Sequence, residues 1–368
     1  RLSFLSGDWA LPQPGEDTLV GLCRKQGFWT TLVTDNYVAT VPRLGGMLLD
    51  EFDTVDFIRG AGSDPWITPS VELLAAAQEM ARVRPTRSAL FEAQFIANCR
   101  RWPEGKPPFE RVFEKAGEHL RELVRHERFL LWVDTFACHE PWASLADLET
   151  AASVPEEPLF PGYVEAGLYS RQHLAALRAR FARRIGETDH ALGPLVSELE
   201  SAMRGGDVGL VVLSDHGFLF GEFGFVGKPA NTPLPPELHE ILCWLSGQFA
   251  ERTFPELGIQ PHSLHWLLRD ALGIEGSRMA GSDLHLFARN SPRSNYLAAA
   301  SQDEIYILEK ALAGTGVEFR TIHRSNADRH RQLASQGEPA ISTSVRESIR
   351  AVLSGGTSPW LLPFREAL

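Results

Sequence analysis

The junction between an apolar run at residues 208–213 and Ser-Asp-His-Gly at 214–217 constrains the fold more than any other stretch. The run is aliphatic on both alternating faces, which is typical of a strand buried in a parallel sheet. Open α/β sheets bind ligands at the carboxyl ends of their strands, where Asp215 and His216 fall. A carboxylate beside an imidazole suits a divalent cation. An ordinary strand-to-loop turn gives the same tripeptide, so both interpretations stand at this point.

A second apolar run at 129–136 leads into a loop with similar polar residues. Pro141 stops regular structure, so we predict that His139 lies on a loop at the carboxyl end of this strand. The stretch 168–203 predicts one long helix or a helix pair, kinked near 193–194, which leads into the strand at 208. Helices joined to buried strands by short connections predict right-handed crossovers and a largely parallel sheet.

The remaining periodicity predicts shorter elements. We expect helices at 17–27 (with Asp17 as its cap), 86–99, 109–126 and 261–272, a strand at 28–36, a loop at 52–66, and short strands at 296–300, 304–308 and 317–322. The fold class is therefore α/β, with a large domain at 1–290 and a small C-terminal α+β subdomain at 291–368.

Composition excludes some classes of function. The net charge of −11 argues against a general nucleic-acid binder, but a local cation or lysine can still attract an anionic substrate. No apolar run approaches the roughly 18 residues that a membrane-spanning helix needs. Four widely spaced cysteines indicate buried free thiols and no zinc or disulfide framework: Cys23, Cys99, Cys138 and Cys243. The chain begins at Arg1 without a visible signal peptide, so localisation stays open.

Several motifs in order resemble the arylsulfatase-like sulfatases of the alkaline-phosphatase superfamily. They are His-Glu-Pro-Trp at 139–142, Ser-Asp-His-Gly at 214–217, Gly-Glu-x-Gly at 221–224 and Gly-Lys at 227–228. Bacterial members also resemble this chain in Val-Thr-Asp-x at 33–36 and Ile-Arg-Gly-x-x-x-Asp-Pro-Trp at 58–66. The resemblance covers about residues 1–290 and implies an alkaline-phosphatase-like, mostly parallel sheet flanked by helices.

The resemblance also bears on the start of the chain. The family's signature is a nucleophilic Cys or Ser in C/S-x-P-x-R, followed by Ser-Leu-Leu-Thr-Gly, and residues 1–7 fit it from the arginine onwards. It implies that a formylglycine nucleophile and a strand with paired Asp ligands lie upstream of Arg1. We therefore expect a chain truncated at its N-terminus, inactive by itself.

The implied activity is metal-dependent hydrolysis of a small-molecule or carbohydrate sulfate monoester. By motif match, Asp215 and His216 are metal ligands, for Ca²⁺ before Mg²⁺ or Mn²⁺. Lys228 contacts a sulfuryl or leaving oxygen, His139 is the general acid, and Arg1 orients the nucleophile. No residue is assigned to another cofactor, and the oligomeric state is not predicted.

Each assignment has a plainer alternative. His139 could be a loop residue satisfied by backbone, Lys228 a solvated loop lysine, and Glu222 a structural turn residue. Asp35 is the weakest candidate, because related sulfatases carry Lys-x-His or Pro-His at that strand end.

Departures from the family pattern indicate a divergent member. Phe223 replaces the histidine of Gly-Glu-His-Gly, and 240–247 lacks the family's proline. Besides a sulfatase, the sequence allows a sulfatase-like pseudoenzyme that serves as a binding module, and a hydrolase of phosphate or phosphonate esters on the same fold.

Overall fold

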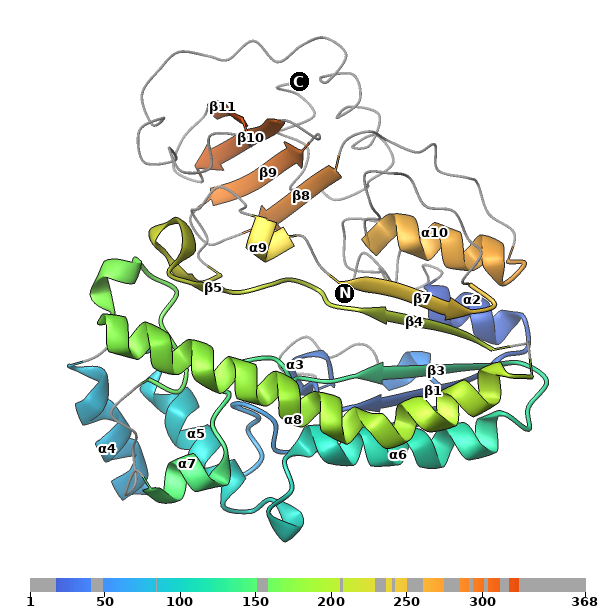
Figure 1. The fold of residues 1–368 in the computed structure, drawn as a ribbon, viewed down its shortest axis with the longest axis horizontal. Helices are drawn as coiled ribbons and strands as arrows, with labels where there is room; N and C mark the ends of the chain where they lie inside the picture. Colours follow the sequence, from blue (N-terminus) through green and yellow to red (C-terminus); the bar gives the residue numbers. More distant parts are fainter. Residues whose placement is uncertain are drawn as a thin grey trace.

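A parallel sheet of three strands lies at the centre of the computed structural model (Figure 1). The structure describes residues 18–40, 49–83, 85–150, 158–205, 208–228, 236–239, 242–249, 261–274, 285–290, 294–300, 304–311 and 318–323. The strand order is β2 (Thr54–Phe57), β1 (Trp29–Thr34) and β3 (Phe129–Asp134). Thr34 pairs with both Phe57 and Asp134, so the carboxyl ends of the three strands meet at one edge.

The other elements complete a layered α/β arrangement. The α-helices are α2 (Leu19–Lys25), α3 (Tyr37–Thr40), α4 (Val71–Ala81), α5 (Ala89–Cys99), α6 (Pro108–Leu123), α7 (Leu145–Thr150), α8 (Arg171–Met203), α9 (Pro236–His239) and α10 (Pro261–Ala271). The further strands are β4 (Gly209–Leu213), β5 (Leu219–Phe220), β6 (Val226–Gly227), β7 (Cys243–Gly247), β8 (His285–Asn290), β9 (Ser294–Ala300), β10 (Glu304–Ala311) and β11 (Glu318–His323). No helix in the described part of the chain combines the length and apolar character needed to cross a bilayer.

The two faces of the sheet carry separate cores, because successive side chains of a strand point to opposite faces. From β3, Leu131 and Val133 pack with α6 and α8. Its alternate residues, Leu130 and Trp132, pack with α2, α10 and Val211 of β4. The sheet is thus covered by helices on both faces, which confirms the predicted alkaline-phosphatase-like fold class.

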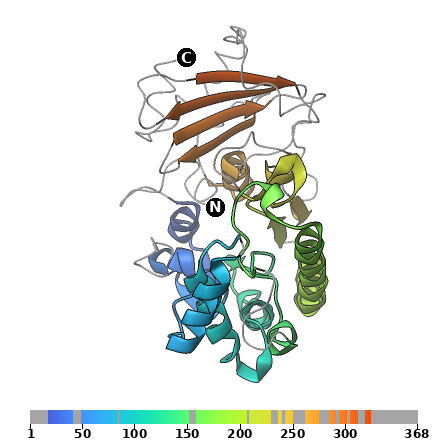
Figure 2. The same ribbon diagram turned by 90° about the vertical axis from the view of Figure 1, so that its left-hand side faces the viewer.

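Helix α8 lies along the outside of the molecule and packs against α6 (Figures 1 and 2). Its first turn is capped by Ser170, whose side chain accepts a hydrogen bond from the backbone N–H of His173. The prediction allowed one long helix or a kinked pair, and the structure has a single helix that contains Pro194.

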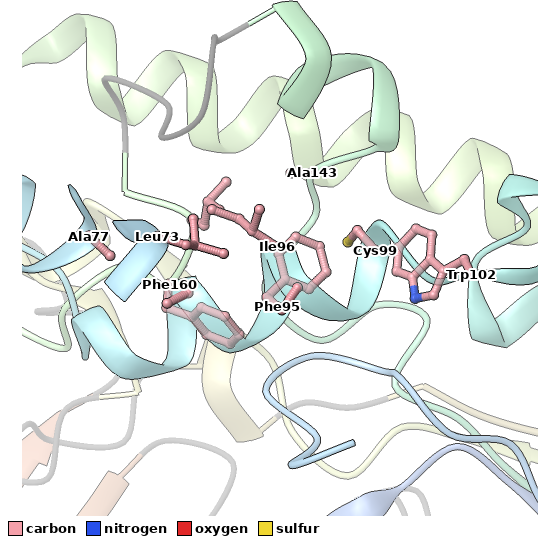
Figure 3. Close-up of a cluster of buried hydrophobic side chains, with 11 residues drawn as sticks. Leu73, Ala77, Phe95, Ile96, Cys99, Trp102, Ala143 and Phe160 are labelled. Carbon is pink, nitrogen blue, oxygen red and sulfur yellow. The ribbon is translucent and has the colours of Figure 1, made fainter. Parts of the chain in front are cut away.

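Helices α4 and α5 build a further core next to the central sheet. Figure 3 shows Phe95 and Ile96 of α5 near Leu73 of α4 and Phe160, with Cys99 of the same helix next to Trp102. Helix α4 was not predicted. The prediction of a loop at 52–66 was wrong at β2, and the cap of α2 is not Asp17 but Thr18, whose side chain accepts from the backbone N–H of Gly21. Two thiols are buried as expected, Cys23 and Cys99, but Cys138 is exposed and Cys243 only half-buried.

The Arg-Gly-x-x-x-Asp motif is a structural loop. Arg59 donates two hydrogen bonds of 2.8 Å to the buried carboxylate of Asp64, which also accepts from the backbone N–H of Gly60. Gly60 has a φ of 102°, and a Cβ there would lie 2.8 Å from the Trp66 ring. This motif therefore supports the carboxyl edge of the sheet and does not itself supply reactive groups.

Three groups of described strands depart from parallel pairing. Strands β5 and β6 form an antiparallel hairpin. Strand β4 was predicted to lie in a parallel sheet, which was wrong, because it pairs antiparallel with β7, with Val211 opposite Leu245. Strands β8 to β11 form an antiparallel sheet in the order β11-β10-β9-β8, at one end of the molecule in Figure 2. This sheet begins at His285 and contains the three short strands that the sequence predicted.

Candidate functional site

Two loops that follow β3 and β4 carry most of the predicted site residues. Strand β3 ends at Asp134 and is followed by the loop that holds His139 and Glu140. Strand β4 ends at Leu213 and is followed by Asp215 and His216. Apolar strands fix both loops, while the polar residues after them are free to face the edge of the sheet.

His139 is fixed between the backbone and Lys228. Its Nδ1 lies 2.6 Å from the carbonyl oxygen of Glu140, and its Nε2 lies 3.3 Å from Lys228 Nζ. A carbonyl oxygen only accepts, so Nδ1 carries the proton and donates it to this oxygen. The lone pair on Nε2 then accepts from the ammonium of Lys228. Both nitrogens of the ring are engaged, one by backbone as the plainer interpretation held and one by a predicted site residue.

Lys228 is not a solvated loop lysine. Its side chain is only 14% exposed, and its Nζ lies 3.4 Å from Glu140 Oε2. The ammonium also lies 5.3 Å from the centre of the Tyr163 ring. Lys228 follows the short β5–β6 hairpin, in which Gly227 has a φ of 86° and leaves no room for a Cβ against Tyr163. The hairpin therefore aims this lysine at His139.

Glu140 is the buried anion of the site. Its side chain is 1% exposed and accepts a hydrogen bond from the hydroxyl of Tyr163. Arg87 Nη1 lies 3.6 Å from Oε1 and donates to the Tyr163 hydroxyl at 3.0 Å. Burying a carboxylate is costly unless donors and opposite charges surround it, and here they come from three other segments of the chain.

Burial sets the protonation states of this group. It lowers the pKa of His139 to about 4, with Glu140 opposing and Lys228 adding to the shift. Burial also lowers the pKa of Lys228, against the opposing carboxylate of Glu140. For Glu140, burial alone raises the pKa, but His139, Lys228 and the Tyr163 hydroxyl bring it below its usual value. At neutral pH the imidazole is therefore neutral and the carboxylate ionised.

Asp215 and His216 form the second half of the site. His216 Nδ1 lies 3.0 Å from the carbonyl oxygen of Gly217 and therefore carries the proton. Its Nε2, with the lone pair, lies 3.7 Å from Asp215 Oδ2. Two ligands at right angles on one Ca²⁺, each at about 2.4 Å, are separated by roughly 3.4 Å. The pair thus fits two adjacent positions on one cation.

The donor set for a cation is incomplete within the described residues. No group of three or more His, Cys, Asp or Glu side chains in that part of the chain is arranged to hold a metal ion. Asp215 and His216 are compatible with a metal, but they fill only part of the six to eight positions that Ca²⁺ takes.

The two halves influence each other electrostatically. The carboxylate of Asp215 opposes the lowering of the Lys228 pKa, and the charge of Lys228 adds to the lowering of the His216 pKa, which burial dominates. The structure therefore brings His139, Lys228, Asp215 and His216 close enough for their charges to influence one another. Arg1 lies outside the described residues.

Asp35 has a structural role. Its carboxylate accepts from the backbone N–H of Phe136 at 2.7 Å and from the Thr135 hydroxyl at 3.1 Å, which ties the ends of β1 and β3 together. Glu222 is structural as the plainer interpretation held, because it accepts from the backbone N–H of Phe220 and from Arg178.

A small cavity of about 20 Å³ lies behind the His139 loop. Asp35, His139 and Arg184 contribute to its lining. Its size suits about one water molecule. The Trp142 ring is buried against Phe181, Phe218 and Phe220.

Sequence reasoning missed three residues of this site: Glu140, Tyr163 and Arg87. Glu140 stood inside a quoted motif, next to His139, and a charged residue between a histidine and a proline was the available signal. Tyr163 and Arg87 are 23 and 53 positions from Glu140 in the sequence, and no motif marks them.

Comparison with known proteins decides the family. A family model described as Sulfatase matches residues 4–265. The chain belongs to the sulfatase family. A search of curated protein sequences found no significant match. The match includes both strand-end loops and Lys228, so a sulfatase-family hydrolase on the alkaline-phosphatase fold accounts for the described site.

Solved structures resemble this sulfatase-family chain in fold. The phosphonate monoester hydrolase of Agrobacterium radiobacter has a TM-score of 0.62 at 14% identity, over 96% of this chain and 85% of that one. A protein solved in complex with its substrate D-glucosamine-2-N,6-O-disulfate has a TM-score of 0.56 at 12% identity, over 96% and 88%.

Proposed function

We propose that the intact protein is a metal-dependent hydrolase of sulfate monoesters whose leaving oxygen meets Lys228 and His139. The observation that carries this proposal is the contact of 3.3 Å between Lys228 Nζ and His139 Nε2. The charge of Lys228 also interacts with Asp215 and His216. A partly buried ammonium aimed at one point stabilises negative charge there far better than a solvated lysine does.

The reaction breaks the S–O bond of R–O–SO₃⁻. Water supplies an oxygen to sulfur and a proton to the departing alkoxide, which gives R–OH and hydrogen sulfate. Lys228 holds its N–H groups where the alkoxide charge develops, and His139 Nε2 accepts from the same ammonium. The general acid in this proposal is therefore the Lys228–His139 pair, because a neutral imidazole first needs a proton from its neighbour.

Asp215 and His216 would hold a divalent cation, with Ca²⁺ before Mg²⁺ or Mn²⁺. Such a cation supplies Lewis-acid stabilisation of the sulfuryl oxygens. The proton on His216 Nδ1, fixed by the carbonyl of Gly217, leaves Nε2 available as a ligand. The formylglycine nucleophile expected upstream of Arg1 belongs to the same proposal.

The experiment compares esters that share one leaving group. The full-length gene product is assayed on para-nitrophenyl sulfate, para-nitrophenyl phosphate and para-nitrophenyl phenylphosphonate, before and after chelation. Preference for the sulfate, lost on chelation and restored by Ca²⁺, is the expected result. Preference for the phosphonate would replace this proposal with the phosphonate-ester alternative, which the fold of the Agrobacterium enzyme also accommodates. No turnover of any ester would favour a binding module.

The chain from Arg1 alone is a useful control. We expect it to hydrolyse none of the three esters, because the proposal places the nucleophile upstream of Arg1. Turnover by this chain at the rate of the full-length protein would contradict the expected position of the nucleophile.

A further inference from the structure

Glu140 touches both members of the proposed acid pair with one oxygen. Its Oε2 lies 3.4 Å from Lys228 Nζ and 3.4 Å from His139 Nδ1. Its other oxygen, Oε1, faces away from the pair, toward the Tyr163 hydroxyl and Arg87. One oxygen of the carboxylate therefore lies against Lys228 and His139, and the other is held by Tyr163 and Arg87.

The two residues that hold Oε1, Tyr163 and Arg87, also contact each other. Arg87 lies over two aromatic rings, with its guanidinium carbon 4.8 Å from the centre of Tyr163 and 5.6 Å from that of Phe91. It also donates to the Tyr163 hydroxyl. A planar cation stacked on aromatic rings loses little further freedom when it makes an ion pair. Arg87 and Tyr163 together act as a clamp that fixes the Glu140 carboxylate.

The carboxylate in turn decides where Lys228 can sit. A lysine that is 14% exposed is stable as an ammonium only beside an anion, and Lys228 forms an ion pair with Glu140, itself 1% exposed. The same residue fixes the His139 ring through its backbone carbonyl, which accepts from Nδ1, and its Oε2 lies 3.4 Å from the same nitrogen. The lone pair on Nε2 is thereby turned toward the ammonium.

We propose that Glu140, clamped by Tyr163 and Arg87, is the positioning residue that aims Lys228 and His139 at the leaving oxygen. This inference rests on the proposed function and adds a residue that contacts no reacting atom. It predicts an effect that depends on the leaving group. A poor leaving group depends more on charge stabilisation and proton transfer than a good one. Displacement of Lys228 and His139 should therefore slow hydrolysis of its ester more.

The test measures kcat/KM of the full-length protein for a series of aryl sulfates, from para-nitrophenyl to unsubstituted phenyl sulfate. For Glu140→Gln we expect a loss of about 10-fold on the nitrophenyl ester and about 100- to 1000-fold on the phenyl ester. Tyr163→Phe removes only a hydroxyl. It should lower kcat/KM by about 3- to 10-fold, again more for the phenyl ester than for the nitrophenyl ester. Tyr163→Phe also keeps the test decisive if Glu140→Gln does not fold.

Glu92→Gln is the matched control. Glu92 is likewise a fully buried carboxylate, but it accepts from Thr86 and from the backbone N–H of Leu159 and contacts neither member of the pair. Its loss should lower turnover of all esters by one common factor. If Glu140→Gln also lowers all esters by one factor, Glu140 is merely structural and the inference is wrong.

A measurement without turnover separates this inference from the proposed function. The ring ¹⁵N signals of His139, assigned with His139→Gln, should move in Glu140→Gln and Tyr163→Phe and stay in place in Glu92→Gln. Unchanged signals in all three variants would overturn the positioning role even if no ester is hydrolysed. Absence of turnover by the wild type, with moved signals, would instead sink the proposed function alone.

Discussion

The loops after β3 and β4 use the same backbone device for different purposes. In each, a histidine Nδ1 donates to the carbonyl of the next residue, Glu140 in one and Gly217 in the other, and so presents the lone pair of Nε2. The difference is burial. His139 is 23% exposed and its lone pair meets an ammonium, whereas His216 is 42% exposed and its lone pair lies beside a carboxylate.

The difference shows that one backbone conformation places two histidines in surroundings of different charge. The loop after β3 has its counter-charges in place, since Glu140, Lys228 and Tyr163 are all in contact. The loop after β4 presents two ligands to which a cation could add. The loop after β3 holds a completed charge network, whereas the loop after β4 would bind a cation in the proposed function.

The largest expected effect comes from removing the Lys228 ammonium from the charge network after β3. Lys228→Ala should lower kcat/KM of the full-length protein for phenyl sulfate by about 1000-fold, because the leaving oxygen loses its stabilising charge. Steady-state kinetics measure this, and Lys115→Ala on the exposed face of α6 is the control. A loss of less than 10-fold would remove Lys228 from the reaction.

The second largest expected effect concerns Asp215, a proposed cation ligand in the loop after β4. Asp215→Asn should weaken Ca²⁺ binding to the full-length protein by about 100-fold, because a charged ligand is replaced by a neutral one. Titration calorimetry, or the rise of Tm with Ca²⁺, measures it. Asp56→Asn is a matched control, since Asp56 lies 3.5 Å from His119 in another carboxylate–imidazole pair. Equal weakening by both variants would refute a specific site at Asp215.

The smallest expected effect is a dependence of stability on pH that results from the burial of His139. Burial holds the pKa of His139 at about 4, below the 6.5 of an unperturbed histidine. Between these values the unfolded chain binds more protons than the folded one, so stability falls as pH drops from about 6.5 to about 4. We expect this residue to contribute about 3 kcal/mol of that loss.

Comparison of variants isolates this contribution, because Glu140, Lys228 and His216 also face or influence the ring. The difference in free energy of unfolding between wild type and His139→Gln, from urea melts at pH 7.5 and 5, should narrow toward the lower pH. His119→Gln is the control. A difference that does not change with pH for His139→Gln would show that the imidazole is not held neutral.

The sequence predicted the parts of this site that stand at strand ends. β3 and β4 are mainly apolar runs, so the positions of His139, Asp215 and His216 after them could be predicted from the sequence pattern. Strand β2 was missed because Thr54–Phe57 is short and carries Asp56. Glu140, Tyr163 and Arg87 could not be assigned, since their roles come from burial and from contacts between distant segments.

The most direct test of the account is a crystal structure of the full-length protein with Ca²⁺ and sulfate. The account predicts a cation bonded to Asp215 and His216 Nε2, and a sulfate oxygen within hydrogen-bonding distance of Lys228 Nζ, with Glu140 still bound to Tyr163. A cation bound elsewhere, or a sulfate that does not contact Lys228, would contradict the claim that the two strand-end loops form one active site.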